Sequence, residues 1–165
     1  MRTIYFLLVM SVLFVLGCPY YSDFPLSEPS TPFPEEYLGC WKALGSADSA
    51  FVLLVAADSC QVDIREHYYH QDGAISYYED LTYVGWLSRI DSVYFLNVKD
   101  WDTLLDKYVY YLYRLEFYET SVHAIEVNGD LMFVPESSQQ LQDTLRCYLQ
   151  EDFLYGDMEI YYRCD

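Results

Sequence analysis

Basic residues are scarce in this chain of 165 residues, which holds 9 Lys and Arg against 26 Asp and Glu and has a formal net charge of −17. Proteins that bind nucleic acids or anionic lipid headgroups need a surface rich in Lys and Arg. The composition therefore argues against both kinds of partner. With 19 Tyr, 9 Phe and 3 Trp the chain is also too aromatic for a disordered protein, and its length suits one domain.

The motifs of several common enzyme and metal-site classes are also missing. The chain has no Gly-x-Ser-x-Gly, no Gly-rich phosphate-binding loop and no His-Glu-x-x-His. No pair of its cysteines has the Cys-x-x-Cys spacing of redox sites and zinc ribbons. His67 and His70 would lie on opposite faces of a strand, so they would not share a metal. We therefore expect no catalytic residue, no metal and no cofactor.

Residues 1–17 are expected to form a signal peptide. Arg2 precedes an apolar run from Ile4 to Leu16, which only Ser11 interrupts. This run has 13 residues, fewer than the about 20 that span a bilayer, and has the length of a signal-peptide hydrophobic segment. It ends in Val15-Leu16-Gly17-Cys18, which resembles the lipobox of bacterial lipoproteins.

The lipobox resemblance implies where the protein is held. In such proteins the chain is cleaved before the Cys, here Cys18, and acyl chains on its thiol anchor the protein in the lipid bilayer. Asp after the Cys retains enteric-type lipoproteins in the inner membrane, but here Pro19 follows. The resemblance thus favours the outer membrane of a host with two membranes, and otherwise the outer face of the cell membrane. The alternatives are an ordinary secretory signal and an uncleaved membrane helix.

Two further segments are expected after the signal peptide. Residues 18–36 contain five prolines among Ser, Thr and acidic residues, which is typical of an extended, semi-rigid tether. Residues 37–165 are rich in strand-forming residues, with turn residues at hairpin-like intervals, and are expected to form the folded domain. We expect strands at 37–45, 50–57, 60–70, 75–89, 92–98, 107–118, 121–128 and 131–134.

The clearest alternation lies in residues 107–118, where one face is expected to point into the core: Val109, Tyr111, Tyr113, Leu115 and Phe117.

A helix is expected after Ser137, because Ser137 to Gln140 has the spacing of a capping box and an apolar stripe follows: Leu141, Leu145, Tyr148 and Leu149. Residues 157–163 then predict a closing strand. So many consecutive short strands indicate an antiparallel barrel or sandwich.

Two resemblances favour the barrel. Gly39-Cys40-Trp41 is similar to the Gly-x-Trp signature of lipocalins and related calycins, which implies that Trp41 plugs the closed end. Over most of residues 37–163 the chain is also similar to a family of small, uncharacterised bacterial lipoproteins. Together the two resemblances imply an antiparallel lipocalin-like barrel with one C-terminal α-helix and a closing strand. The lipoprotein family has no assigned activity, so the resemblance implies none for this chain. The matching stretches are Phe51 to Val55, Val84 to Ile90, Val93 to Val98, Tyr110 to Glu116, Ser137-Ser138 with the helix, and Leu154 to Asp157.

Four cysteines remain besides Cys18: Cys40, Cys60, Cys147 and Cys164. An even number in an exported domain indicates disulfides, and four thiols allow three connectivities. We favour Cys40 with Cys60 and Cys147 with Cys164, because each pair closes a short segment between neighbouring elements.

The abundant tyrosines suit barrel interiors, ligand cavities and protein-binding surfaces alike. We therefore expect a binding protein and weigh two kinds of partner. One is a basic protein that contacts the acidic, Tyr-rich surface. The other is a small apolar ligand inside the barrel, for which Trp41, Tyr111 and Tyr113 are the candidate contacts. Bulky inward Tyr and Phe favour a filled barrel and hence the protein partner, while an envelope enzyme is the least favoured function.

The lipid anchor predicts the mass of the mature protein. Extracted from membranes of its host, the protein should have the mass of residues 18–165 plus acyl chains, and Cys18→Ser should abolish this species because only a thiol forms the thioether. Intact-mass spectrometry of both proteins measures the difference. A soluble protein without acyl chains would contradict the anchor.

Overall fold

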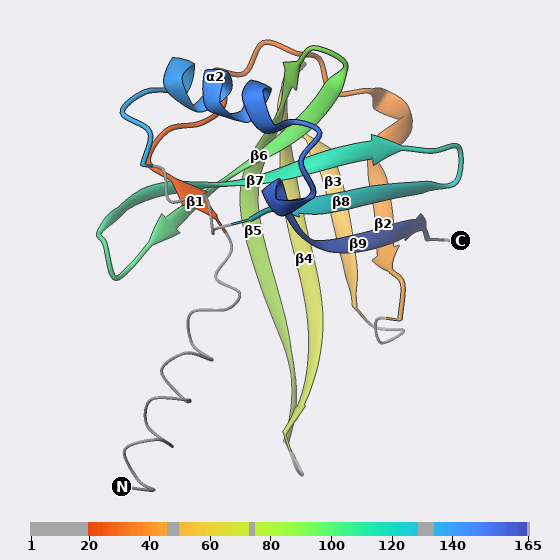
Figure 1. The fold of residues 1–165 in the computed structure, drawn as a ribbon. Helices are drawn as coiled ribbons and strands as arrows, with labels where there is room; N and C mark the ends of the chain where they lie inside the picture. Colours follow the sequence, from red (N-terminus) through yellow and green to blue (C-terminus); the bar gives the residue numbers. More distant parts are fainter. Residues whose placement is uncertain (1–19, 46–49, 73–74, 129–133, 165) are drawn as a thin grey trace, which may run out of the picture.

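The computed structural model describes residues 20–45, 50–72, 75–128 and 134–164, which contain nine strands and one α-helix. Figure 1 shows their arrangement. The elements are β1 (Tyr21–Ser22), η1 (Glu35–Tyr37), β2 (Gly39–Ala43), β3 (Phe51–Ala56), β4 (Gln61–Asp72), β5 (Ile75–Ile90), β6 (Val93–Asp102), β7 (Lys107–Phe117), β8 (Ser121–Val127), α2 (Ser138–Tyr148), η2 (Asp152–Leu154) and β9 (Tyr155–Arg163).

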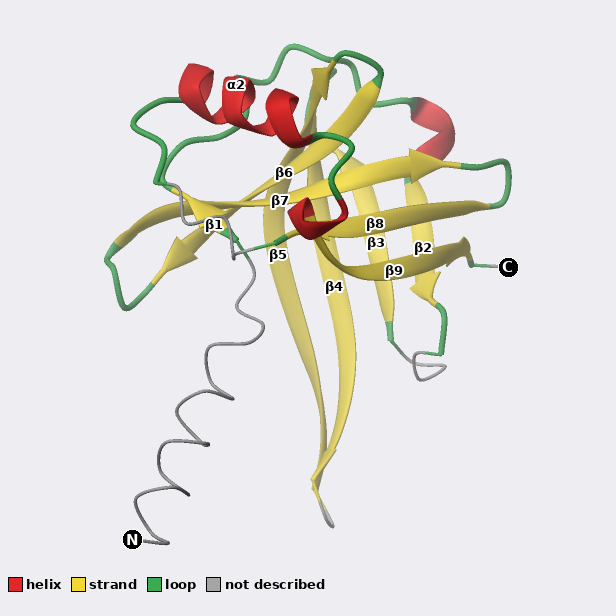
Figure 2. Cartoon of the chain, in the orientation of Figure 1, coloured by secondary structure: helices red, strands yellow, loops and turns green. Residues whose placement is uncertain are grey.

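Eight of these strands close into an antiparallel barrel. From β2 to β9 each strand pairs with the next, and β9 pairs back onto β2. The short β1 lies outside this ring and pairs with β7. The molecule is therefore mainly β and lipocalin-like in shape, with α2 against one side and the last strand closing the barrel (Figure 2). This confirms the predicted fold class.

The predicted strands correspond closely to the observed ones. The largest difference is in β6, which continues to Asp102, four residues beyond the predicted end. Its extension pairs with the start of β7, so that Asp102 lies opposite Lys107. The predicted short strand at 131–134 falls on residues outside the described part of the chain, except for Val134, which is not in a strand. No helix in the described residues is long and apolar enough to cross a membrane.

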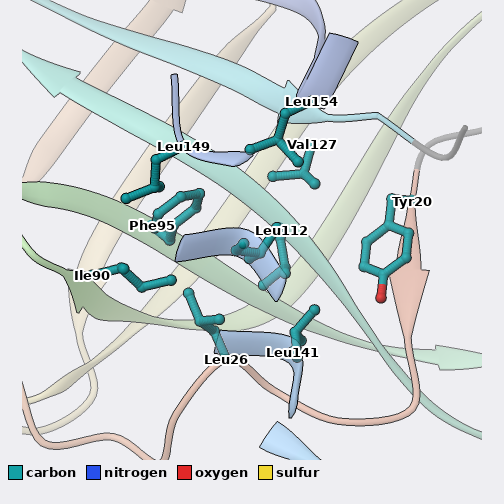
Figure 3. Close-up of a cluster of buried hydrophobic side chains, with 10 residues drawn as sticks. Tyr20, Leu26, Ile90, Phe95, Leu112, Val127, Leu141, Leu149 and Leu154 are labelled. Carbon is teal, nitrogen blue, oxygen red and sulfur yellow. The ribbon is translucent and has the colours of Figure 1, made fainter. Parts of the chain in front are cut away.

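The α-helix covers the outer face of the barrel. Ser137 caps α2, since its hydroxyl accepts a hydrogen bond from the Gln140 N–H at 3.2 Å, as the capping pattern predicts. The helix packs on outward side chains of β5, β6 and β7 (Figure 3), in a cluster that contains Leu26, Ile90, Phe95, Leu112, Leu141, Leu145 and Leu149. Tyr148 differs from the prediction: it is 41% exposed, and its ring lies against Phe153.

The prediction of an extended tether is wrong for residues 20–36. Tyr20, Leu26 and Phe33 are buried, and the Leu26 N–H donates to the Asn97 side chain at 2.7 Å. Well-spaced apolar residues let this segment pack on the barrel. Its prolines favour the packing, because a chain already restricted to extended backbone loses less entropy when it lies on a surface.

The favoured disulfide pairing is also wrong. Cys40 bonds Cys164, with their Cα atoms 5.3 Å apart, whereas Cys60 and Cys147 are free thiols. The reason is the closure of the barrel: β9 pairs with β2, so Cys164 lies beside Cys40 despite a sequence separation of 124. A preference for short segments ignores such a long-range contact.

Leu145 tests the contact between helix and barrel, because its side chain is fully buried there. Leu145→Ala should lower the free energy of unfolding by about 2–5 kcal/mol through lost burial and a residual cavity. The control Gln139→Ala, at an exposed position of the same helix, should change it by less than about 0.5 kcal/mol. Denaturant titration measures both values, and equal losses would contradict the packing described here.

Candidate ligand-binding cavity in the barrel

The interior of the barrel contains a cavity of about 420 Å³. This volume lies in the range of sites for small organic molecules, and eight strands can enclose one such ligand. The expectation that bulky rings fill the barrel is therefore wrong. Tyr111, Tyr113 and Tyr161 line the cavity, but small side chains such as Val52 and Ala124 share the same wall and leave space between them.

One end of the cavity is apolar and aromatic. Trp41 is buried there, and its indole N–H donates to the Tyr37 carbonyl at 3.0 Å. The ring of Phe117 lies 4.3 Å from that of Tyr37. Arg163 covers Trp41 with its guanidinium group 5.7 Å from the ring, and donates to the carbonyls of Glu36 and Leu38. These contacts fill this end of the barrel beside η1.

The other end is acidic and rich in tyrosine. Along β7, Tyr113 lies four residues before Phe117, or about 13 Å along the strand. Glu66 and Glu159 also line the cavity, and the negative charge of each raises the pKa of Tyr113. The Tyr68 hydroxyl donates to Glu66 at 3.0 Å, and the Tyr161 hydroxyl donates to Glu159. Glu159 is exposed and Glu66 is half-buried, so this end opens to solvent.

Burial and nearby negative charges raise the pKa of Glu66, Tyr113 and Tyr161. Burial raises the pKa of Glu66, and the negative charge of Glu159 raises it further, although the hydrogen bond from Tyr68 opposes both effects. Burial also raises the pKa of Tyr113 and of Tyr161 far above the ordinary value of a phenol. Among the described residues that line the cavity, three are carboxylates and none is basic: Glu66, Asp100 and Glu159. The site therefore has unbalanced negative charge.

The predicted candidates are brought together only in part. Trp41, Tyr111 and Tyr113 all line the cavity. Cys60 lies in the turn before β4 and Cys147 on the outer helix, so neither contributes to it. Cys18 falls outside the described residues. No group of three metal-ligating side chains occurs in the part of the chain that the structure describes.

Sequence reasoning missed the carboxylates of the cavity. The available signal was their alternation with apolar or aromatic residues: Ile64, Glu66 and Tyr68 occupy one face of β4, and Glu159 and Tyr161 one face of β9. With 26 acidic residues in the chain, this pattern did not stand out from chance pairs of carboxylates.

Comparisons of the chain with protein-family models, with curated proteins and with solved structures find no match.

Glu66 is expected to lower stability at neutral pH. Because its pKa is raised in the folded state, the folded protein holds the proton more tightly than the unfolded chain does. Stability is therefore lost as the pH rises from the ordinary range of a Glu, about 4.3, through the raised value. Glu66→Gln removes this loss and should raise the free energy of unfolding at pH 7, with little effect near pH 3.5.

Denaturant titrations at the two pH values measure the effect. Glu119→Gln, which removes the same charge from an exposed turn, is the matched control and should change stability little at either pH. Destabilisation by Glu66→Gln at pH 7 would contradict the electrostatic account.

Proposed function

We propose that this protein is a binding protein that holds a small organic molecule inside its barrel. The observation that carries the proposal is the cavity of about 420 Å³, apolar at its closed end and polar at its mouth. Such a combination buries the body of a ligand and orients it through a few polar groups. A cavity that joins an apolar end to a few polar groups is typical of a ligand-binding site, so binding is the proposed activity.

The scaffold supports binding because it holds the cavity open before a ligand arrives. The strands β2 to β9 pair in a closed ring, and the Cys40–Cys164 disulfide joins β2 to the end of β9 at the closure. A wall fixed in this way loses little conformational freedom on binding, which lowers the cost of forming the complex.

We also propose that the barrel is held at a membrane through acylated Cys18. The sequence pattern before Cys18 supports this, and so does an exposed apolar surface on the β6–β7 hairpin. That surface consists of Trp101, Leu104, Leu105 and Tyr108, and Leu104 is 94% exposed. Lys107 pairs with Asp23 at 2.6 Å, so the hairpin lies beside the beginning of the described chain, just after the proposed anchor. Exposed apolar side chains of this kind suit a lipid interface.

A basic protein partner is the second candidate. The net charge of −17 favours it, because complementary charge speeds and orients protein association. This candidate does not use the cavity, so a cavity-blocking variant separates the two functions.

Ala124 offers a way to block the cavity. Its side chain points into the barrel from β8, and Ala124→Trp should weaken binding of a neutral apolar fluorophore such as N-phenyl-1-naphthylamine at least tenfold by occupying its space. Thr120→Trp, in the exposed β7–β8 turn, is the matched control and should bind like the parent. Fluorescence titration of the full chain measures the affinities, because residues 20–36 pack on the barrel and belong to the fold.

Thermal unfolding of each variant shows that it is folded before binding is compared. If Ala124→Trp does not fold, Val52→Phe, at a cavity-lining position on β3, serves the same purpose. Absence of fluorophore binding by the parent protein, or equal binding by the blocked variant, would contradict a ligand inside the barrel.

A further inference from the structure

We propose that the ligand of the barrel is an organic cation, an amine with an apolar body, whose ammonium group lies between Glu66 and Glu159 at the mouth. This inference rests on the proposed function and names its ligand class. The apolar body would extend toward Trp41 at the closed end.

The charge of the cavity favours a cation. Its described lining holds Glu66, Asp100 and Glu159 and no Lys, Arg or His. A carboxylate that is partly removed from water is unfavourable unless a positive charge or hydrogen-bond donors compensate it. The protein supplies the Glu66 carboxylate with a donor, Tyr68, but with no cation from the described lining. A cationic ligand provides the missing charge, whereas an anionic ligand adds to the repulsion.

The two carboxylates are held by hydrogen bonds from neighbouring tyrosines. The hydroxyls of Tyr68 and Tyr161 each donate to the carboxylate two residues before them on the same strand. Each carboxylate accepts several hydrogen bonds through its two oxygens, so both retain capacity for the N–H groups of an ammonium. Tyr113 lines the cavity from β7, and its ring adds a face that attracts cations.

A simple metal ion does not match this cavity. No group of three metal-ligating side chains occurs among the described residues, so the two glutamates do not form part of a coordination cage. The cavity also continues from the carboxylates to Phe33, Tyr37, Trp41 and Phe117, an apolar end that a bare ion would leave empty. A molecule with one charged and one apolar end matches both parts of the cavity.

Three compounds with one skeleton test the inference: 2-phenylethylamine, 2-phenylethanol and 3-phenylpropanoate. They carry a phenyl ring on a two-carbon linker and differ in the charge of the end group at pH 7. Displacement of N-phenyl-1-naphthylamine from the full chain measures their affinities. We expect the amine to bind at least tenfold tighter than the alcohol, and the carboxylate to bind weakest.

In the double variant Glu66→Gln with Glu159→Gln the amine should lose its advantage over the alcohol, with both affinities determined against the fluorophore affinity measured for the variant itself. Glu119→Gln with Glu151→Gln removes two charges from exposed positions and should keep the parent's preference. If the fluorophore binds but the amine binds no tighter than the alcohol, the inference is overturned and the proposed function survives. If the control pair abolishes the preference as well, net charge rather than the site is responsible, which also overturns it. Failure of the fluorophore to bind overturns the proposed function itself.

Discussion

The hydrogen bonds between β2 and β9 are the contact on which the rest of the structure depends. They join strands from opposite ends of the domain and convert an open antiparallel sheet into a ring. The same pairing brings Cys164 to Cys40 and lays Arg163 over Trp41. The register between β2 and β9 thus produces the closure of the barrel, the disulfide and the sealed end of the cavity. Without this pairing the inward faces would lose their common interior.

Local patterns predicted the elements well and their long-range partners poorly. The alternation of Tyr and aliphatic residues identified the inward face of β7, and the spacing of Leu141, Leu145 and Leu149 identified the helix. Those patterns depend on neighbours within a few residues. The Cys40–Cys164 pair and the packing of Leu26 depend on which strands meet and on which outer face is left to cover. Sequence spacing carries no information about such contacts when they join distant parts of the chain.

The residues of the cavity also fall into those that local patterns predicted and those that depend on long-range contacts. Trp41, Tyr111 and Tyr113 were chosen for their aromatic character and all line it. The carboxylates of Glu66 and Glu159 became meaningful only when the register placed β4 and β9 around one interior. Burial disfavours the charged form of Glu66, and Glu159 lines the same cavity. Their position at the mouth of an apolar cavity is explained by the ligand that we propose, which compensates them when it binds.

The account's central claim is that a cationic ligand lies inside the barrel with its apolar part toward the closed end. Intermolecular nuclear Overhauser effects between 2-phenylethylamine and the full chain test this orientation directly. The account predicts contacts from the phenyl protons to the rings of Trp41 and Phe117, and from the methylene beside the ammonium to those of Tyr113 and Tyr161. Contacts confined to residues on the outer face, or the reverse orientation inside the barrel, would contradict it.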